Sequence, residues 1–187
     1  MKLPPMPKER WQDTPELVQA FRAGDPEAFQ KLYNAYARGV YRFCLRLLGD
    51  ATAAEDAFQD TWLRAYEHRH ELRSDGFRVW LFRIAYRVCL NCRRQRRECQ
   101  EFDEELAPGS LDVNTDPYLR EHIRRALERL PERLRAVVLL RIYEECSYEE
   151  IAAILGIEVG AARVRMHRAR LLLRRWLAAI VQDYNGF

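Results

Sequence analysis

Residues 147–170 carry the clearest chemical signal in this chain. Ile151, Ile154 and Leu155 share one face of a short helix, and Gly156 ends it. A second helix follows, and its basic side chains point away from its apolar ones. These basic side chains are Arg163, Arg165, His167, Arg168, Arg170, Arg174 and Arg175. A short helix, a turn with glycine and a basic second helix predict a helix-turn-helix motif that enters the major groove of DNA.

The charges along the chain fall into blocks, although the formal net charge is only +3. Residues 83–97 hold six arginines and no acid, and residues 163–175 hold six more. Between them, residues 98–119 hold seven acids and no base. Two basic blocks separated by an acidic connector indicate a nucleic-acid partner.

The upstream basic block lies on a helix that begins near Phe77. Its polar side chains fall close to one face of that helix: Arg83, Arg87, Asn91, Arg94 and Arg97. Trp80 lies near the same face and could either receive an unstacked base or belong to the core. Arginines bind phosphates and aromatic rings stack on bases, so this face is suited to DNA that is being melted.

Helix start signals divide the chain into elements. The capping residues are Thr14, Asp25, Asp50, Asp116 and Ser147. Apolar residues recur every three or four positions after each cap, and no segment alternates as a strand would. We therefore predict an all-α fold with a disordered leader (residues 1–13), a helical domain (14–97), a flexible acidic linker (98–116) and a second helical domain (117–187).

Several classes of protein are disfavoured. No apolar run approaches the roughly 20 residues of a membrane span, and no signal sequence precedes residue 13, so we expect a cytosolic protein without membrane insertion. Cys89-x-x-Cys92 and Cys99 suggest a metal site, but zinc needs a fourth ligand, and we favour structural cysteines. No nucleophile, phosphate loop or catalytic carboxylate pair stands out, so we expect no cofactor and no enzymatic activity.

Six local motifs resemble those of bacterial sigma factors of the extracytoplasmic-function group, and they follow one another in the same order and at the same spacing. Proteins of this group retain only the conserved sigma regions 2 and 4. The match runs from about Asp25 to Trp176. The motifs are Asp25-Pro-Glu-Ala-Phe, Ala54-Glu-Asp-Ala-Phe-Gln-Asp-Thr-Trp, Phe77-Arg-Val-Trp-Leu-Phe-Arg-Ile-Ala, Leu130-Pro-Glu-Arg-Leu-Arg, Tyr148-Glu-Glu-Ile-Ala and Val159-Gly-Ala-Ala-Arg-Val-Arg-Met-His-Arg-Ala-Arg.

The resemblance implies a promoter-specificity subunit that binds the clamp and flap of core RNA polymerase, while the polymerase does the chemistry. The implied clamp contacts are Asp56, Gln59, Asp60 and Arg64. The implied contacts with the −10 element are Ser74, Asp75, Trp80, Arg83, Arg87, Asn91, Arg94 and Arg97. The implied contacts with the −35 element are Arg163, Val164, Arg165, His167, Arg168, Arg170 and Arg174. A flipped base would enter a pocket formed by residues 71–77.

Within the second basic helix, Arg163 and Arg168 are the candidates for reading guanine edges. Arg165, Arg170 and Arg174 are the candidates for holding phosphates. His167 could contact DNA or be idle. The family usually has Thr at position 161, Ser at 164 and Asn at 87, where this chain has Ala161, Val164 and Arg87. Base preferences of the family therefore do not transfer to this chain.

Other functions remain open at the level of sequence. A dimeric helix-turn-helix regulator would bind a palindrome without polymerase, and a decoy would only imitate a sigma factor to capture its inhibitor. The resemblance further implies an anti-sigma partner, a monomer when free of partners, and a place at the nucleoid or, through that partner, at the membrane. The acidic linker is either solvated disorder or a mimic of the RNA path.

Overall fold

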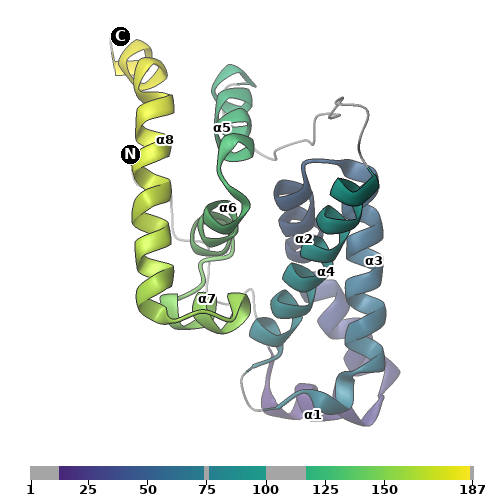
Figure 1. Ribbon diagram of the computed structural model, residues 1–187. Helices are drawn as coiled ribbons and strands as arrows, with labels where there is room; N and C mark the ends of the chain where they lie inside the picture. Colours follow the sequence, from purple (N-terminus) through teal and green to yellow (C-terminus); the bar gives the residue numbers. More distant parts are fainter. Residues whose placement is uncertain (1–12, 74–75, 100–116, 186–187) are drawn as a thin grey trace.

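The computed structural model describes residues 13–73, 76–99 and 117–185, with side chains placed for 13–73, 76–96 and 118–178. Within these ranges every regular element is helical, which confirms the predicted all-α class. Figure 1 shows two groups of helices lying side by side. Most of the predicted leader and linker falls outside the described residues.

The first group contains α1 (Pro15–Ala23), α2 (Pro26–Leu48), α3 (Ala51–Glu67), the short η2 (Arg69–Glu71) and α4 (Phe77–Cys99). The predicted caps of the first three helices are confirmed: Thr14 Oγ1 accepts from the amide of Leu17 at 3.3 Å, and the carboxylates of Asp25 and Asp50 also accept backbone amides. Gly24 ends α1 with a φ of 88°, which glycine adopts without strain.

Buried rings hold the first group together. Phe77, the first residue of α4, lies 5.2 Å from Phe21 of α1 and 5.2 Å from Tyr36 of α2, centroid to centroid. All three side chains are fully buried. These contacts fix the start of α4, so its basic residues occupy a defined position on the domain surface.

The second group contains α5 (Pro117–Arg129), α6 (Glu132–Val138), a π-helical segment η3 (Leu139–Tyr143), α7 (Tyr148–Leu155) and α8 (Val159–Asn185). The predicted capping box is confirmed: the amide of Glu150 donates to Ser147 Oγ at 3.1 Å, and the amide of Ser147 donates to Glu150 Oε2 at 2.7 Å. Gly156 has a φ of 65° and turns the chain from α7 into α8.

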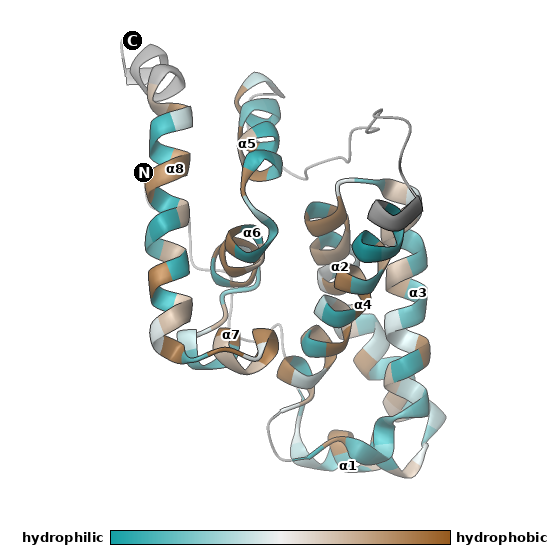
Figure 2. Ribbon diagram, in the orientation of Figure 1, coloured by the Kyte–Doolittle hydropathy of each residue, from teal (hydrophilic) through white to brown (hydrophobic). Residues whose placement is uncertain are grey.

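The two groups of helices contact each other directly. Helix α4 packs against α7, and α2 packs against α5, α6 and η3. Figure 2 shows brown apolar and teal hydrophilic residues interspersed along the helices, and many of the apolar side chains are buried in the core. Among the described residues, no helix is long and apolar enough to cross a bilayer.

Candidate nucleic-acid interface

The second helix of the helix-turn-helix is held by one apolar face. Ala162, Met166 and Ala169 are buried against α6 and α7, at the three- and four-residue spacing of a helix. The opposite face carries the exposed residues Arg163, Val164, His167 and Arg168. Val164 exposes 49% of its surface. Helix α8 therefore presents a rigid face with two arginines, a histidine and one apolar side chain.

Further basic residues flank this face of α8. Arg170 and Arg174 are exposed, and Arg165 is half-buried. Arg163 has partners within the motif: its Nη2 lies 3.6 Å from Glu149 Oε1, and its guanidinium lies 5.6 Å from the ring centre of Tyr148. Its side chain is still 63% exposed, so it can leave these partners for a DNA base.

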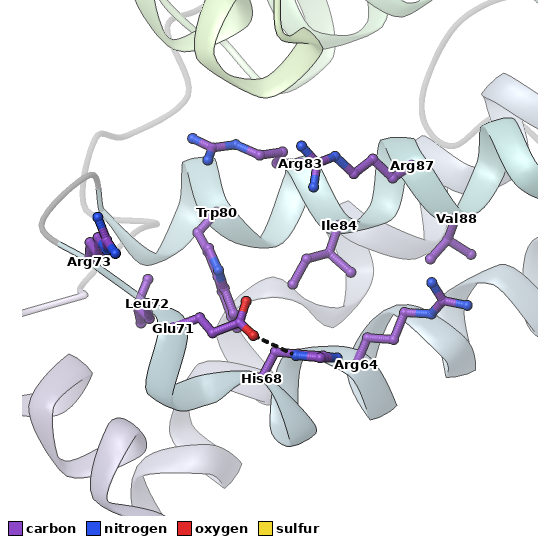
Figure 3. Close-up of a pocket in the computed structure, with 10 residues that line it drawn as sticks. All are labelled: Arg64, His68, Glu71, Leu72, Arg73, Trp80, Arg83, Ile84, Arg87 and Val88. Atoms are coloured by element: carbon purple, nitrogen blue, oxygen red, sulfur yellow. Dashed lines mark hydrogen bonds and ion pairs between the residues drawn. The ribbon is translucent and has the colours of Figure 1, made fainter.

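A cavity of about 550 Å³ lies between α3 and α4, next to the turn that joins them. Figure 3 shows the ten residues that line it: Arg64, His68, Glu71, Leu72, Arg73, Trp80, Arg83, Ile84, Arg87 and Val88. His68 Nδ1 lies 2.9 Å from Glu71 Oε1, and this contact lowers the pKa of the Glu71 carboxyl. Four arginines and an indole around one cavity are suited to a nucleotide, whose phosphate is anionic and whose base can stack.

Trp80 contacts the core and also lines the cavity. Its ring packs 6.0 Å from Phe77 and 6.3 Å from Phe21, so it extends the core. The same side chain lines the cavity and is half-buried. Farther along α4, Asn91 and Arg94 are exposed.

Three of the predicted contacts with the −10 element cannot be placed. Ser74 and Asp75 lie outside the described residues, and so does the side chain of Arg97. Glu71, Leu72 and Arg73, from the segment 71–77 that the resemblance implied as a base pocket, line the cavity. The cavity also contains His68, which the sequence did not single out because it belongs to the turn after α3 and not to a helical face with the predicted residues.

The polar face of α3 carries the predicted clamp contacts. Asp56, Gln59 and Arg64 are exposed, and Asp60 is half-buried with an oxygen 2.8 Å from Arg64 Nε. The opposite face is buried through Ala57, Thr61, Trp62 and Ala65.

Sequence reasoning missed two apolar residues beside this polar face of α3. Leu63 is 57% exposed and Tyr66 is 42% exposed. Leu63 and Tyr66 are three residues apart and each follows a buried residue, Trp62 or Ala65, by one position. This spacing was the signal in the sequence that both lie outside the buried face of α3.

The cysteines are packing residues in the described part of the chain. Cys44, Cys89 and Cys146 are buried, and Cys92 is half-buried. A hydrogen bond with Cys44, together with burial, raises the pKa of the Cys89 thiol well above its ordinary value. Among the described residues, no three His, Cys, Asp or Glu side chains gather closely enough to hold a metal ion.

Comparison with known proteins decides the family. The model of "Sigma-70 region 2" matches residues 32–98, and that of "Sigma-70, region 4" matches residues 120–173. ECF RNA polymerase sigma factor SigW of Bacillus subtilis is 30% identical over 176 residues, which cover 86% of this chain and 94% of SigW. The chain belongs to the ECF sigma factors. SigE of Mycolicibacterium smegmatis is 34% identical over 178 residues, covering 89% of this sigma factor and 69% of SigE.

Solved structures agree with this assignment. CnrH, in complex with the cytosolic domain of CnrY, superposes on this sigma factor with a TM-score of 0.70 and 25% identity, covering 88% of this chain and 96% of CnrH. RpoE of Bartonella quintana, in complex with the anti-sigma factor NepR, gives a TM-score of 0.71 and 27% identity over 80% of this chain and 96% of that one. The sequence-based prediction of an ECF sigma factor is thus confirmed, and a polymerase-independent regulator or a decoy is not favoured.

Proposed function

We propose that this sigma factor reads the −35 element with the exposed face of α8. The main support for this proposal is that the basic residues of α8 are exposed on the side opposite its buried face. Arg163 and Arg168 project from a helix whose other face is buried, so their backbone positions on α8 are set before DNA arrives. Each can donate two hydrogen bonds to one guanine, a contact that favours guanine over the other bases by about 1–3 kcal/mol. Val164 is placed to meet a thymine methyl, and His167 lies between these contacts. Arg165, Arg170 and Arg174 hold phosphates.

Helix α4 and the cavity beside it take the −10 element in this proposal. Arg83 and Arg87 line the cavity, and Asn91 and Arg94 continue from it along α4, giving a path for a phosphate backbone. The cavity of about 550 Å³ would receive one unstacked base against Trp80. Ser74, Asp75 and Arg97 complete the proposed set from the sequence.

The polar face of α3 is the proposed surface for core RNA polymerase. Asp56, Gln59, Asp60 and Arg64 would contact the clamp, with the exposed Leu63 as an apolar anchor beside them. The second helical domain would meet the polymerase flap. The polymerase forms the RNA bonds, so this sigma factor needs no catalytic group or cofactor of its own.

Regulation by an anti-sigma factor is part of the proposal. One structural relative, RpoE of Bartonella quintana, was solved with the anti-sigma factor NepR, and another, CnrH, was solved with the cytosolic domain of CnrY. We infer that this chain is a monomer between partners, works at the nucleoid, and is held at the membrane when its anti-sigma factor is a membrane protein.

The test combines the purified chain, core RNA polymerase and genomic DNA fragments, and the run-off transcripts are sequenced. We expect transcripts that start downstream of a shared two-part motif. The absence of both transcripts and comigration with core polymerase would contradict the proposed function.

A further inference from the structure

Arg163 of α8 contacts the first turn of α7. Its guanidinium lies over the ring of Tyr148, 5.6 Å from the ring centre, and its Nη2 lies 3.6 Å from Glu149 Oε1. Tyr148 and Glu149 are the first two residues of α7, so one helical turn supplies an aromatic ring and a carboxylate to the same guanidinium. Helices α7 and α8 pack against each other across the turn at Gly156, which brings these side chains together.

The backbone at Tyr148 is held by the capping box of α7. The amide of Glu150 donates to Ser147 Oγ, and the amide of Ser147 donates to Glu150 Oε2. These two hydrogen bonds close the first turn of the helix around Tyr148. The backbone that carries the ring therefore keeps its helical geometry.

The ring of Tyr148 has a second cationic neighbour. The guanidinium of Arg141 lies 5.2 Å from the ring centre, and its Nη1 donates to the carbonyl oxygen of Cys146 at 2.8 Å. Cys146 is fully buried, so this hydrogen bond ties Arg141 to a well-packed part of the backbone. The ring itself is half-buried and packs against the core. Both the backbone and the ring of Tyr148 are thus in place before DNA binds.

The ring and the carboxylate engage different parts of the Arg163 guanidinium. An aromatic ring attracts the planar face of a guanidinium, whereas a carboxylate and a guanine base both accept hydrogen bonds from the N–H groups along its edge. A guanine can therefore replace Glu149 while the ring stays in contact. The ion pair is easily exchanged, because 63% of the Arg163 side chain and 65% of the Glu149 side chain are exposed.

A ring that orients this arginine in advance affects base preference more than general affinity for DNA. A long side chain loses rotamer freedom when it binds a base, and this loss weakens the contact. Restricting the guanidinium beforehand reduces the loss. The benefit arises only at promoters with guanine at the contacted position, because other bases do not order the side chain of Arg163.

We propose that Tyr148 is a positioning residue for base reading: its ring holds the guanidinium of Arg163 in the orientation that contacts guanine in the −35 element. This inference rests on the proposed function, since it deepens the role of Arg163. Tyr148 acts through Arg163 and needs no DNA contact of its own. Removal of the ring should lower the preference for guanine at that position by about two- to fivefold, because the strength of an exposed cation–π contact limits how firmly the guanidinium is held.

The test is run-off transcription by the full chain and core polymerase on promoters that carry every base at each −35 position. Tyr148→Leu removes the ring but keeps an apolar side chain, and it should lower the preference only at the position that Arg163→Ala flattens. Tyr148→Phe keeps the ring and should retain the preference. In the Arg163→Ala background, Tyr148→Leu should cause no further loss of preference. The matched control is Tyr118→Leu, at an exposed tyrosine of α5, which should change no preference.

A loss spread evenly over all −35 positions in Tyr148→Leu would indicate a merely structural role and would overturn the proposal. An equal loss in Tyr148→Phe would also overturn it, because the ring would then not be the active part. If Arg163→Ala flattens one position while Tyr148→Leu leaves that position unchanged, only the positioning role fails. If Arg163→Ala flattens no position, the proposed reading by Arg163 fails instead.

Nuclear magnetic resonance of the free chain tests the contact without DNA or polymerase. The δ protons of Arg163 are assigned by their absence in Arg163→Ala. The ring current should shift them upfield in the wild type and in Tyr148→Phe, and they should return to ordinary values in Tyr148→Leu. Unshifted protons in the wild type would contradict the positioning role. Circular dichroism and urea unfolding check that each variant is folded, and Tyr148→Met takes the place of Tyr148→Leu if the latter is not.

Discussion

Replacing Arg163 with alanine should relax the choice of base at the −35 element. The side chain is 63% exposed, and its pairing with Glu149 at 3.6 Å is at the surface, where such pairs contribute little. Nearly the full discrimination of a bidentate arginine–guanine contact is therefore available to lose. At about 1–3 kcal/mol, the preference should fall by about 5- to 150-fold.

The assay is run-off transcription with core polymerase on a pool of promoters that carry every base at each −35 position. Arg163→Ala should flatten the preference at one position and leave the others unchanged. Arg174→Ala is the matched control, because an exposed phosphate contact should weaken all promoters evenly and reduce the salt slope by about 0.9. An even loss over all promoters in Arg163→Ala would refute the direct reading by this side chain.

Three further predictions concern other parts of the molecule. Trp80→Ala should reduce promoter opening, detected by permanganate, by about 5- to 150-fold, since base stacking contributes about 1–3 kcal/mol; equal opening would exclude a stacking role. Glu145 has a left-handed backbone conformation, with a φ of 54°, so Glu145→Gly should preserve the free energy of unfolding in urea, whereas Glu145→Val should lower it by about 1–3 kcal/mol. Equal stabilities of the two variants would contradict backbone strain at this position. Burial raises the pKa of Cys146 to about 12, above its ordinary value of 9.0. Its thiol should therefore resist iodoacetamide at pH 8 until the chain unfolds, and stability from the protonated thiol should be lost as pH rises from 9.0 to about 12.

The helices of this protein could be predicted because their signals are local. The capping carboxylate of Asp50 accepts a hydrogen bond from the amide of Ala53, only three residues along the chain. The buried residues Ala162, Met166 and Ala169 repeat with the helical period. The same periodicity places Arg163 and Arg168 on the exposed side of α8. The basic faces were therefore readable from spacing alone.

The cavity near Trp80 was only partly predictable. Arg83 and Arg87 follow from the helical period of α4, and Arg73 lies in the segment 71–77 that only the family resemblance indicated, whereas His68 comes from a turn that has no period. Their place depends on how α3 packs against α4, through buried residues that are far apart in the chain. Trp80 shows the same limit, since the sequence could not show that one ring serves both core and cavity.

The sequence by itself determined the helices, their capped ends and the two basic faces, because each depends on residues within a few positions of one another. Only the tertiary structure decided the contacts between domains. Arg78 and Glu144 are 66 residues apart, and Leu47 and Arg135 are 88 apart. The strained Glu145 and the π turn before it likewise depend on these distant partners, which bring no periodic signal to the sequence.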